Sequence, residues 1–356
     1  MSARTTRRRL APAVVLAAVT TVLLTACGSG PTDSGEAAGS ASSPGEAEDG
    51  AFPVTIEHTF GETTIEAEPT RVVTVGLKEQ DDLLALGVVP VATSAWLDET
   101  PGAIYPWAAD LLGGAETPTL IDNTSDGVQF EQIAAQEPDL IIAVYSGLTE
   151  QDYETLSDIA PVVAQPAGIP DYGVSWQDEL ITVGKAVGKP QQAADLVEQT
   201  EQQIQQLAAA NPQLAGQTAA VAGPFEGEVY AFGPTDPRSR LLTDLGMVYP
   251  DELGAALPDA YGGTLSAERI DLLDLGTVVW TAEPDVTRDE VFGNGAYAAL
   301  AVHAEGREVL VPDSSDYGKA FSFVTVLSLP FVYEQLVPQL VAAADGDPAT
   351  EVPASV

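Results

Sequence analysis

The chain contains very little cysteine, histidine or positive charge. Its 356 residues include one cysteine, two histidines and 14 lysines and arginines, against 53 aspartates and glutamates. A zinc site built from cysteine and histidine would lack ligands. The net charge of −39 also argues against nucleic acid as a partner, because phosphates are neutralised by clustered lysine and arginine. We therefore expect neither a metal site in the protein nor a nucleic-acid partner.

Catalytic motifs are also missing from the sequence. A Ser-His-Asp triad would have to use His58, in a strand-like run, or His303, after an alanine-rich segment. Neither a P-loop nor Gly-x-Ser-x-Gly occurs, and Gly293-Asn294-Gly295 lacks the third glycine of a dinucleotide loop. We predict no catalytic residue and no enzymatic activity.

The single cysteine, Cys27, follows an apolar stretch that begins after four arginines. That stretch, residues 10–24, is shorter than the ~20 residues needed to span a bilayer, and it predicts a secretory signal over residues 1–26. Leu24-Thr25-Ala26-Cys27 resembles the lipobox of bacterial lipoproteins, whose cysteine is lipidated, commonly with palmitate, and becomes the first mature residue. Thr6-Arg7-Arg8 leaves Sec and twin-arginine export both open.

The composition of the chain after Cys27 distinguishes a short polar segment from a longer folded part. Residues 27–50 are mainly small, polar or acidic, which predicts a flexible tether, with folding beginning near Phe52. The domain prediction is an N-terminal α/β lobe at 51–173, a helical connector at 174–212, a C-terminal α/β lobe at 213–345 and a tail at 346–356.

Strand-like and helix-like segments alternate in both predicted lobes. In the first lobe we expect a hairpin around Phe60-Gly61-Glu62, strands at 71–75 and 140–144, and helices at 79–86 and 130–135. In the second we expect strands at 218–222, 229–232, 277–280 and 309–311, and helices at 240–245 and 331–343. Such alternation predicts parallel sheets covered by helices, in two Rossmann-like lobes.

Helix signals dominate the segment between the lobes. One helix is predicted at 176–187, stopped by Gly188, and a second from Pro190 to residue 210, ended by Asn211-Pro212. Apolar side chains recur at helical spacing along the second helix. We expect this long helix to join the two lobes, with a ligand cleft between them.

Several segments, in this order and spacing, resemble the substrate-binding proteins of ABC importers. The similarity is to the class, with one rigid helix between the lobes, that carries ferric siderophores, haem and vitamin B12. It covers roughly residues 52–343 and rests on Glu68-Pro69-Thr70-Arg71-Val72-Val73-Thr74, the run 81–91, Phe130-Glu131-Gln132-Ile133, Glu137-Pro138-Asp139-Leu140-Ile141-Ile142, Leu265-Ser266-Ala267-Glu268-Arg269-Ile270 and Ser328-Leu329-Pro330.

The resemblance assigns two acidic residues to docking. In this family one glutamate on each lobe faces arginines of the permease, and Glu131 and Glu268 occupy the matching positions. Each is expected early in a helix, where the helix dipole also favours a carboxylate.

Ligand-contacting residues are expected beyond the carboxyl ends of the strands. The aromatic candidates are Trp96, Tyr145, Phe225 and Trp280, with Tyr317 in an acidic loop. Arg238 and Arg240 lie in a turn before a helix, where family members often use an arginine to contact oxygens around iron. The other interpretation of these arginines, a pairing with Asp236 or Asp244, stays open.

These observations together predict a monomeric, lipid-anchored receptor at the outer face of the cytoplasmic membrane. It would deliver a ferric siderophore to an ABC permease and its ATPase, with the membrane contacted only through the lipid. The acidic chain favours neutral or cationic hydroxamate chelates. Vitamin B12 and haem stay open as ligands, as does, from a different class, a lipoprotein hydrolase.

Overall fold

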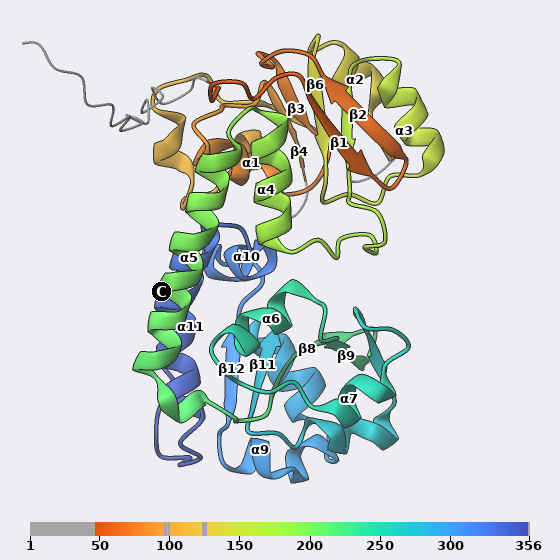
Figure 1. Ribbon diagram of the computed structural model, residues 1–356. Helices are drawn as coiled ribbons and strands as arrows, with labels where there is room; N and C mark the ends of the chain where they lie inside the picture. The colour runs from red at the N-terminus through yellow and green to blue at the C-terminus, as the bar shows by residue number, and fades with distance from the viewer. Residues whose placement is uncertain (1–46, 96–97, 99, 123–126, 355–356) are drawn as a thin grey trace, which may run out of the picture. The chain divides into compact units, whose positions relative to one another are not determined.

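Two five-stranded sheets organise the chain, after a hairpin of β1 (Val54–His58) and β2 (Gly61–Ile65) (Figure 1). The computed structural model describes residues 47–354 except 96–97, 99 and 123–126. We call the first sheet with helices α1–α3 the N-terminal lobe, and the second sheet with helices α6–α9 the C-terminal lobe. The predicted α/β class is confirmed.

The first sheet is entirely parallel, in the order β5-β4-β3-β6-β7. Its central strands are short and fully buried, as the apolar runs Val-Val-Thr and Leu-Ile-Ile-Ala require for a sheet covered on both faces. The elements are β3 (Val72–Thr74), α1 (Glu79–Ala85), β4 (Ala92–Ser94), β5 (Thr119–Ile121), α2 (Phe130–Ala134), β6 (Leu140–Ala143), α3 (Glu150–Ser157) and β7 (Val162–Ala164), with 3₁₀ turns η1 (Pro101–Ala103) and η2 (Ala109–Leu112).

The second sheet is mixed, in the order β10-β9-β8-β11-β12. Strands β8, β11 and β12 are parallel, whereas β9, near one edge, is antiparallel to both β8 and β10. The elements are β8 (Ala219–Phe225), β9 (Glu228–Phe232), α6 (Pro237–Asp244), α7 (Asp251–Ala256), β10 (Gly262–Leu265), β11 (Thr277–Thr281), α8 (Pro284–Val286), α9 (Ala301–Ala304) and β12 (Glu308–Val311), with short helices η3 (Pro212–Leu214), η4 (Ala267–Leu273), η5 (Thr287–Phe292) and η6 (Tyr297–Ala299).

Helices α4 (Trp176–Ala186) and α5 (Pro190–Ala210) lie between the two sheets in the sequence. The predicted ends of α5 are confirmed. Gly188, at φ +72°, turns the chain between the helices, and Pro190 occupies the first turn of α5. Gly184 allows close packing of the pair, since a Cβ there would lie 2.4 Å from the Cβ of Ala193.

The C-terminal helices α10 (Asp316–Phe323) and α11 (Ser328–Ala343) return the chain to the N-terminal lobe. Phe323 packs on Tyr105, with ring centroids 4.8 Å apart, and Thr325 donates to Asp81 over 2.6 Å. That α5 alone joins the lobes therefore stays a prediction, because the segment between α10 and α11 also contacts the N-terminal lobe.

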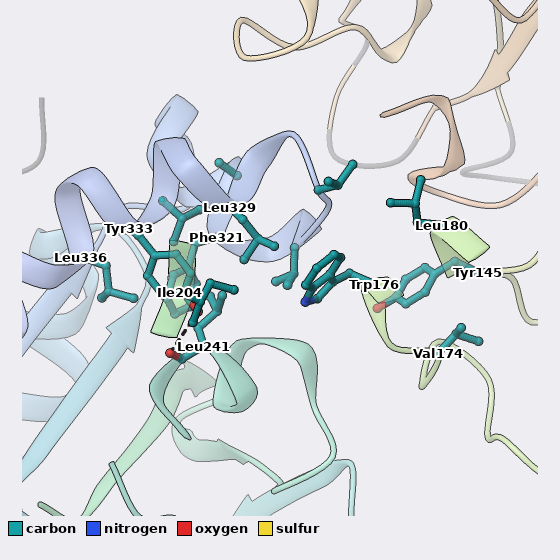
Figure 2. Close-up of a cluster of buried hydrophobic side chains, with 14 of the residues drawn as sticks. Tyr145, Val174, Trp176, Leu180, Ile204, Leu241, Phe321, Leu329, Tyr333 and Leu336 are labelled. Atoms are coloured by element: carbon teal, nitrogen blue, oxygen red, sulfur yellow. Dashed lines mark hydrogen bonds between the residues drawn. The ribbon is translucent and has the colours of Figure 1, made fainter. Parts of the chain in front are cut away.

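One buried apolar cluster includes side chains of both lobes and of the helices between them (Figure 2). Leu180 of α4, Ile204 of α5 and Leu241 of α6 belong to it. Tyr333 of α11 donates its hydroxyl to the carbonyl of Leu241 over 3.3 Å. Each fully buried side chain of this kind contributes roughly 1.5–3 kcal/mol, so the cluster links the lobes energetically.

The segment predicted as a tether is structured at its end. The carboxylate of Glu48 accepts hydrogen bonds from the backbone N–H groups of Gln191 (3.1 Å) and Gln192 (2.9 Å), in the first turn of α5. These donors have no partner inside the helix, so Glu48 caps it. The residues from Ala47 to Ala51 thus belong to the folded part of the chain, which was expected to begin near Phe52.

Among the described residues, no single helix combines the length and apolarity needed to cross a bilayer; only α10 and α11 taken together would qualify, as a pair bent by 113°.

Candidate ligand-binding site

A cavity of about 420 Å³ opens at the carboxyl ends of the parallel strands of the C-terminal lobe. Phe225 ends β8, Thr281 ends β11, and Asp313 follows β12. In open α/β sheets this edge is where ligands bind. We call this cavity the strand-end pocket; its lining is Gly223, Pro224, Phe225, Tyr230, Phe232, Arg238, Thr281, Asp313 and Ser322.

Aromatic rings form one wall of the strand-end pocket. Tyr230 and Phe232 alternate along β9 with the buried Val229 and Ala231, so both rings lie on one face of the strand. Their centroids are 5.1 Å apart, and Phe225 lies 6.2 Å from Tyr230. Phe225 is 53% exposed, which is unusual for a large apolar ring and is consistent with a contact surface for a ligand.

Arg238 provides the positive charge of the pocket, and it is already paired. Its Nε and Nη2 donate to the two carboxylate oxygens of Asp236 over 2.9 and 2.8 Å. Asp236 also accepts from the backbone N–H of Arg238 (2.8 Å) and so caps α6. The guanidinium lies over the ring of Phe232, 3.7 Å from its centroid. Burial alone would lower the pKa of Arg238, but the Asp236 carboxylate raises it, so the guanidinium stays charged.

A larger cavity of about 730 Å³ lies between the loop before α4 and the start of α6. We call it the loop pocket. Its only cation among the described lining residues is Arg240, which donates to the carbonyl of Gly173 over 3.5 Å. Facing it are three aspartates and two tyrosines: Asp171, Asp178, Asp259, Tyr172 and Tyr261.

Tyr145 of the N-terminal lobe contacts a residue of the loop pocket. It lies two residues after the end of β6 and is only 3% exposed, and its ring packs against that of Tyr172, with centroids 5.6 Å apart. Burial raises its pKa, and the nearby Asp236 raises it further, while Arg238 lowers it. Tyr145 is thus a neutral phenol close to the Arg238–Asp236 pair, as expected for a residue behind the site.

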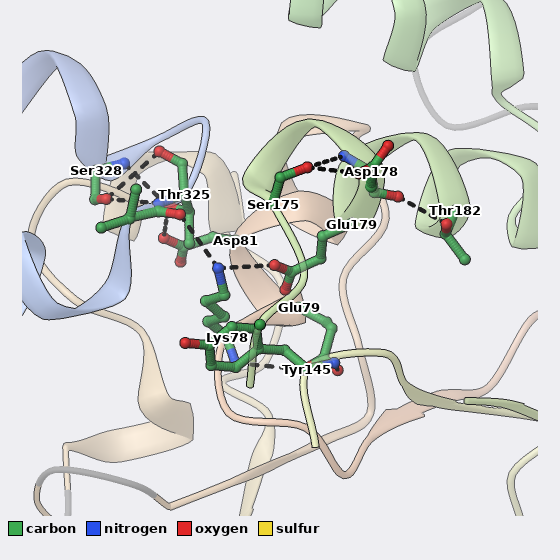
Figure 3. A network of polar contacts seen from close by, with 12 residues as sticks. Lys78, Glu79, Asp81, Tyr145, Ser175, Asp178, Glu179, Thr182, Thr325 and Ser328 are labelled. Atoms are coloured by element: carbon green, nitrogen blue, oxygen red, sulfur yellow. Dashed lines mark hydrogen bonds and ion pairs between the residues drawn. The ribbon is translucent and has the colours of Figure 1, made fainter. Parts of the chain in front are cut away.

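A buried polar cluster lies behind Tyr145 (Figure 3). Lys78 is fully buried; its Nζ pairs with Glu179 of α4 at 2.8 Å, donates to the carbonyl of Val324 at 3.3 Å and lies 4.0 Å from the ring centroid of Tyr145. Asp81 accepts from Thr325 and from Trp107 (2.7 Å). The cluster therefore ties α1, α4 and the α10–α11 turn together.

Acids outnumber bases in this cluster. Four acids are each at most 1% exposed: Glu79, Asp81, Asp82 and Glu179. Lys78 is the lysine buried beside them. Burial raises the pKa of Asp81 to about 6 and that of Glu179 to about 8, although Lys78 opposes both shifts. The pKa of Asp82 is raised well above its usual value by burial and by Glu179. Uncompensated buried carboxyl groups take up protons rather than remain charged.

The predicted ligand-contacting residues do not all lie in one pocket. Phe225 and Arg238 line the strand-end pocket, Arg240 lines the loop pocket, and Tyr145 lies behind them. Trp96, like Cys27, lies outside the described residues.

Trp280 and Tyr317 require a correction. Trp280 is 0% exposed and donates to the hydroxyl of Tyr297 over 3.2 Å within the core of the C-terminal lobe. Tyr317 is also 0% exposed, lies in α10 rather than in a loop, and donates to Gln339 over 2.9 Å. Side chains without accessible surface cannot contact a ligand, so neither belongs to the site.

Sequence reasoning missed several lining residues. Tyr172, Tyr230, Phe232, Tyr261 and Asp313 all line one of the two pockets. The alternation of aromatic and small apolar residues along β9 was the available signal for Tyr230 and Phe232. Nothing local marks Tyr172 and Tyr261, which line the same pocket only because the loop before α4 approaches the loop before β10.

The docking candidates are both at the surface. Glu131 lies in the first turn of α2 and Glu268 in the first turn of η4, and both side chains are exposed. One glutamate thus belongs to each lobe, as the docking prediction requires. Their role itself stays a prediction.

Neither histidine lines the strand-end pocket or the loop pocket. His58 is buried and bonded to Thr63 over 2.9 Å, and His303 pairs with Glu308 at 3.1 Å. Within the described ranges, no three His, Cys, Asp or Glu side chains gather in a way that could hold a metal ion.

The fold matches solved binding proteins. A periplasmic solute binding protein from Mycobacterium smegmatis is 34% identical, with a TM-score of 0.72 over 82% of this chain and 98% of that one. The protein PiaA of Streptococcus pneumoniae, solved in complex with ferrichrome, is 26% identical, with a TM-score of 0.73 over 83% of this chain and 99% of that one. The fold therefore defines a two-lobed binding protein.

The chain belongs to the periplasmic binding protein family, whose sequence profile matches residues 72–305. Two relatives have known or assigned ligands in their names. The Fe(3+) dicitrate-binding periplasmic protein FecB of Escherichia coli is 28% identical over 58% of this chain and 66% of its own length. The probable siderophore-binding lipoprotein YfiY of Bacillus subtilis is 26% identical over 56% of this chain and 58% of its own length. The chain thus spans less than two thirds of these relatives.

Proposed function

We propose that this protein captures a ferric siderophore and delivers it to an ABC importer. The observation that carries the proposal is the strand-end pocket, where Arg238 and a wall of aromatic rings lie at the carboxyl ends of three parallel strands. Relatives named for ferric dicitrate and for siderophore binding, and PiaA with ferrichrome, support this class of ligand. The chelator would supply the ligands to iron.

The charges around the pockets favour a hydroxamate chelate. Arg238 is compensated by Asp236, Asp313 lines the same pocket, and three aspartates outnumber Arg240 in the loop pocket. Hydroxamate chelates are neutral or cationic, whereas ferric catecholates and carboxylates are anionic. An excess of carboxylates attracts cationic chelates and repels anionic ones, and it leaves neutral chelates without a charge penalty.

Calorimetric titration tests the ligand class. We expect ferrioxamine B, a cation, and neutral ferrichrome to bind at least about tenfold more tightly than ferric enterobactin, an anion, at physiological salt. Haem and vitamin B12 are titrated in parallel. A preference for ferric enterobactin would contradict the hydroxamate proposal, and tight binding of haem or cobalamin alone would contradict the siderophore proposal.

We further propose that Cys27 carries the lipid anchor and that the protein works as a monomer outside the cytoplasmic membrane. Two acyl chains suffice for stable attachment. An anchored receptor stays near its permease, and Glu131 and Glu268 would dock on that permease and its ATPase complex, one from each lobe.

Charge reversal tests the docking role. We expect Glu131→Lys combined with Glu268→Lys to reduce siderophore uptake by cells more than tenfold, because two attractive contacts become repulsive. Ligand affinity of the purified variant should be unchanged. The matched control is Glu154→Lys with Glu252→Lys, which reverses one exposed helical glutamate in each lobe. Equal loss of uptake in both double variants, or a loss of ligand affinity in the first, would contradict the assignment.

A further inference from the structure

Asp236 differs from the other acids around the site in being completely buried beneath the pocket cation. It is 0% exposed, whereas its partner Arg238 is 18% exposed and lines the pocket. All three described hydrogen bonds to its carboxylate come from Arg238: the backbone N–H, Nε and Nη2, at 2.8 to 2.9 Å. A ligand therefore meets Arg238 from the pocket side and Asp236 only through Arg238.

In this arrangement the guanidinium of Arg238 can donate hydrogen bonds to a ligand while its positive charge is cancelled. Nε and Nη2 of Arg238 donate to Asp236, whereas Nη1 does not and keeps its hydrogen-bond donors outside this pairing. Its charge, however, is cancelled by a carboxylate held in a region of low dielectric, where charges interact more strongly than in water. Phe232 covers the guanidinium plane at 3.7 Å and limits its movement away from Asp236. The pocket thus offers donors to chelate oxygens without offering net positive charge.

We infer that Asp236 is a specificity-determining residue, which sets the site for neutral or cationic iron chelates by cancelling the charge of Arg238. This inference rests on the proposed siderophore function. Without Asp236, the same arginine would present a full positive charge to the ligand and would favour anionic chelates. Asp313, on the pocket wall near Arg238, adds to the effect but is not held by it.

The test compares Kd ratios for Asp236→Asn and wild type, with ferrioxamine B as the cationic probe and ferric enterobactin as the anionic probe. Asparagine keeps a side-chain oxygen for the α6 cap and removes one charge. We expect the ratio of Kd for the anion to Kd for the cation to fall by roughly tenfold or more. The control is Asp285→Asn, which removes the acid of another local Asp–Arg pair; Asp285 is 88% exposed and its partner Arg288 is 63% exposed, so its ratio should not change.

A double variant keeps the test decisive if Asp236→Asn alone does not fold. Arg238→Gln combined with Asp236→Asn removes both charges together and leaves no unpaired buried ion. Because the two charges cancel in the wild type, we expect the double variant to keep the wild-type anion-to-cation Kd ratio. A ratio that rises by about tenfold, as the loss of an uncancelled positive charge would give, would overturn the inference, and so would an unchanged ratio in a folded Asp236→Asn variant. Failure of wild type to bind any chelate would instead overturn the proposed function, and this inference with it.

Discussion

Replacing Lys78 by methionine is expected to destabilise the protein by about 3–5 kcal/mol at pH 8, the range typical for removing one partner of a buried ion pair. Lys78 is fully buried, its partner Glu179 is 1% exposed, and three further acids share their surroundings. Methionine fills a similar volume, so the loss reflects charge rather than a cavity. It leaves the carboxyl groups of α1 and α4 without a cation.

The measurement is urea unfolding followed by circular dichroism, at pH 8 and pH 5. The cost should be smaller at pH 5, because protonation of Glu179 and Asp82 removes the uncompensated charges. Lys185→Met is the control; Lys185 is exposed in the last turn of α4, and its replacement should change stability by no more than about 0.5 kcal/mol. Wild-type stability of Lys78→Met at pH 8 would contradict the interpretation of the cluster.

The second large effect is a loss of stability as the pH rises. An acid whose pKa is raised on folding binds its proton more tightly in the native state, so its contribution is lost as pH rises from its ordinary pKa toward the folded one. For Asp81 this pH window runs from about 4 to about 6. For Glu179 it runs from about 4 to about 8. The pKa of Asp98 is lowered to about 2, so its opposing gain is complete by about pH 5. We therefore expect wild-type stability to fall between pH 5 and 8.

Asp82→Asn should reduce this dependence. Asp82 Oδ2 has no hydrogen-bond partner among the described residues, and Asp82 is not the direct partner of Lys78. Removing one titrating proton changes the slope by up to about 1.4 kcal/mol per pH unit. Thermal unfolding from pH 5 to 8 measures it, with Asp195→Asn, on exposed α5 surface, as the control. An Asp82→Asn slope equal to that of wild type would show that Asp82 does not titrate in this range.

Local sequence signals predicted the ends of helix α5 but not the existence of helix α10. Both ends of α5 follow from Pro190 and Asn211-Pro212, because helix starts and stops depend on neighbouring residues. Helix α10 was instead expected to be a loop with Tyr317 in it. Its acidic start is a helix N-terminus, where Ser315 accepts from Gly318 N–H over 2.9 Å, and burial of Tyr317 and Phe321 stabilises it. That burial is tertiary and has no local signature.

The sequence by itself determined the α/β class, the family resemblance, and the expected positions of Arg238, Glu131 and Glu268. Each depends on periodicity or on short motifs, which nearby residues encode. Only the tertiary structure decided that Arg238 is neutralised by a buried Asp236, that Trp280 and Tyr317 are core residues, and that four acids are buried around Lys78. Charge and hydropathy predict an acidic residue to be exposed. Burial of these acids depends on α1, α4 and the α10–α11 turn converging from distant parts of the chain, and sequence spacing carries no record of that convergence.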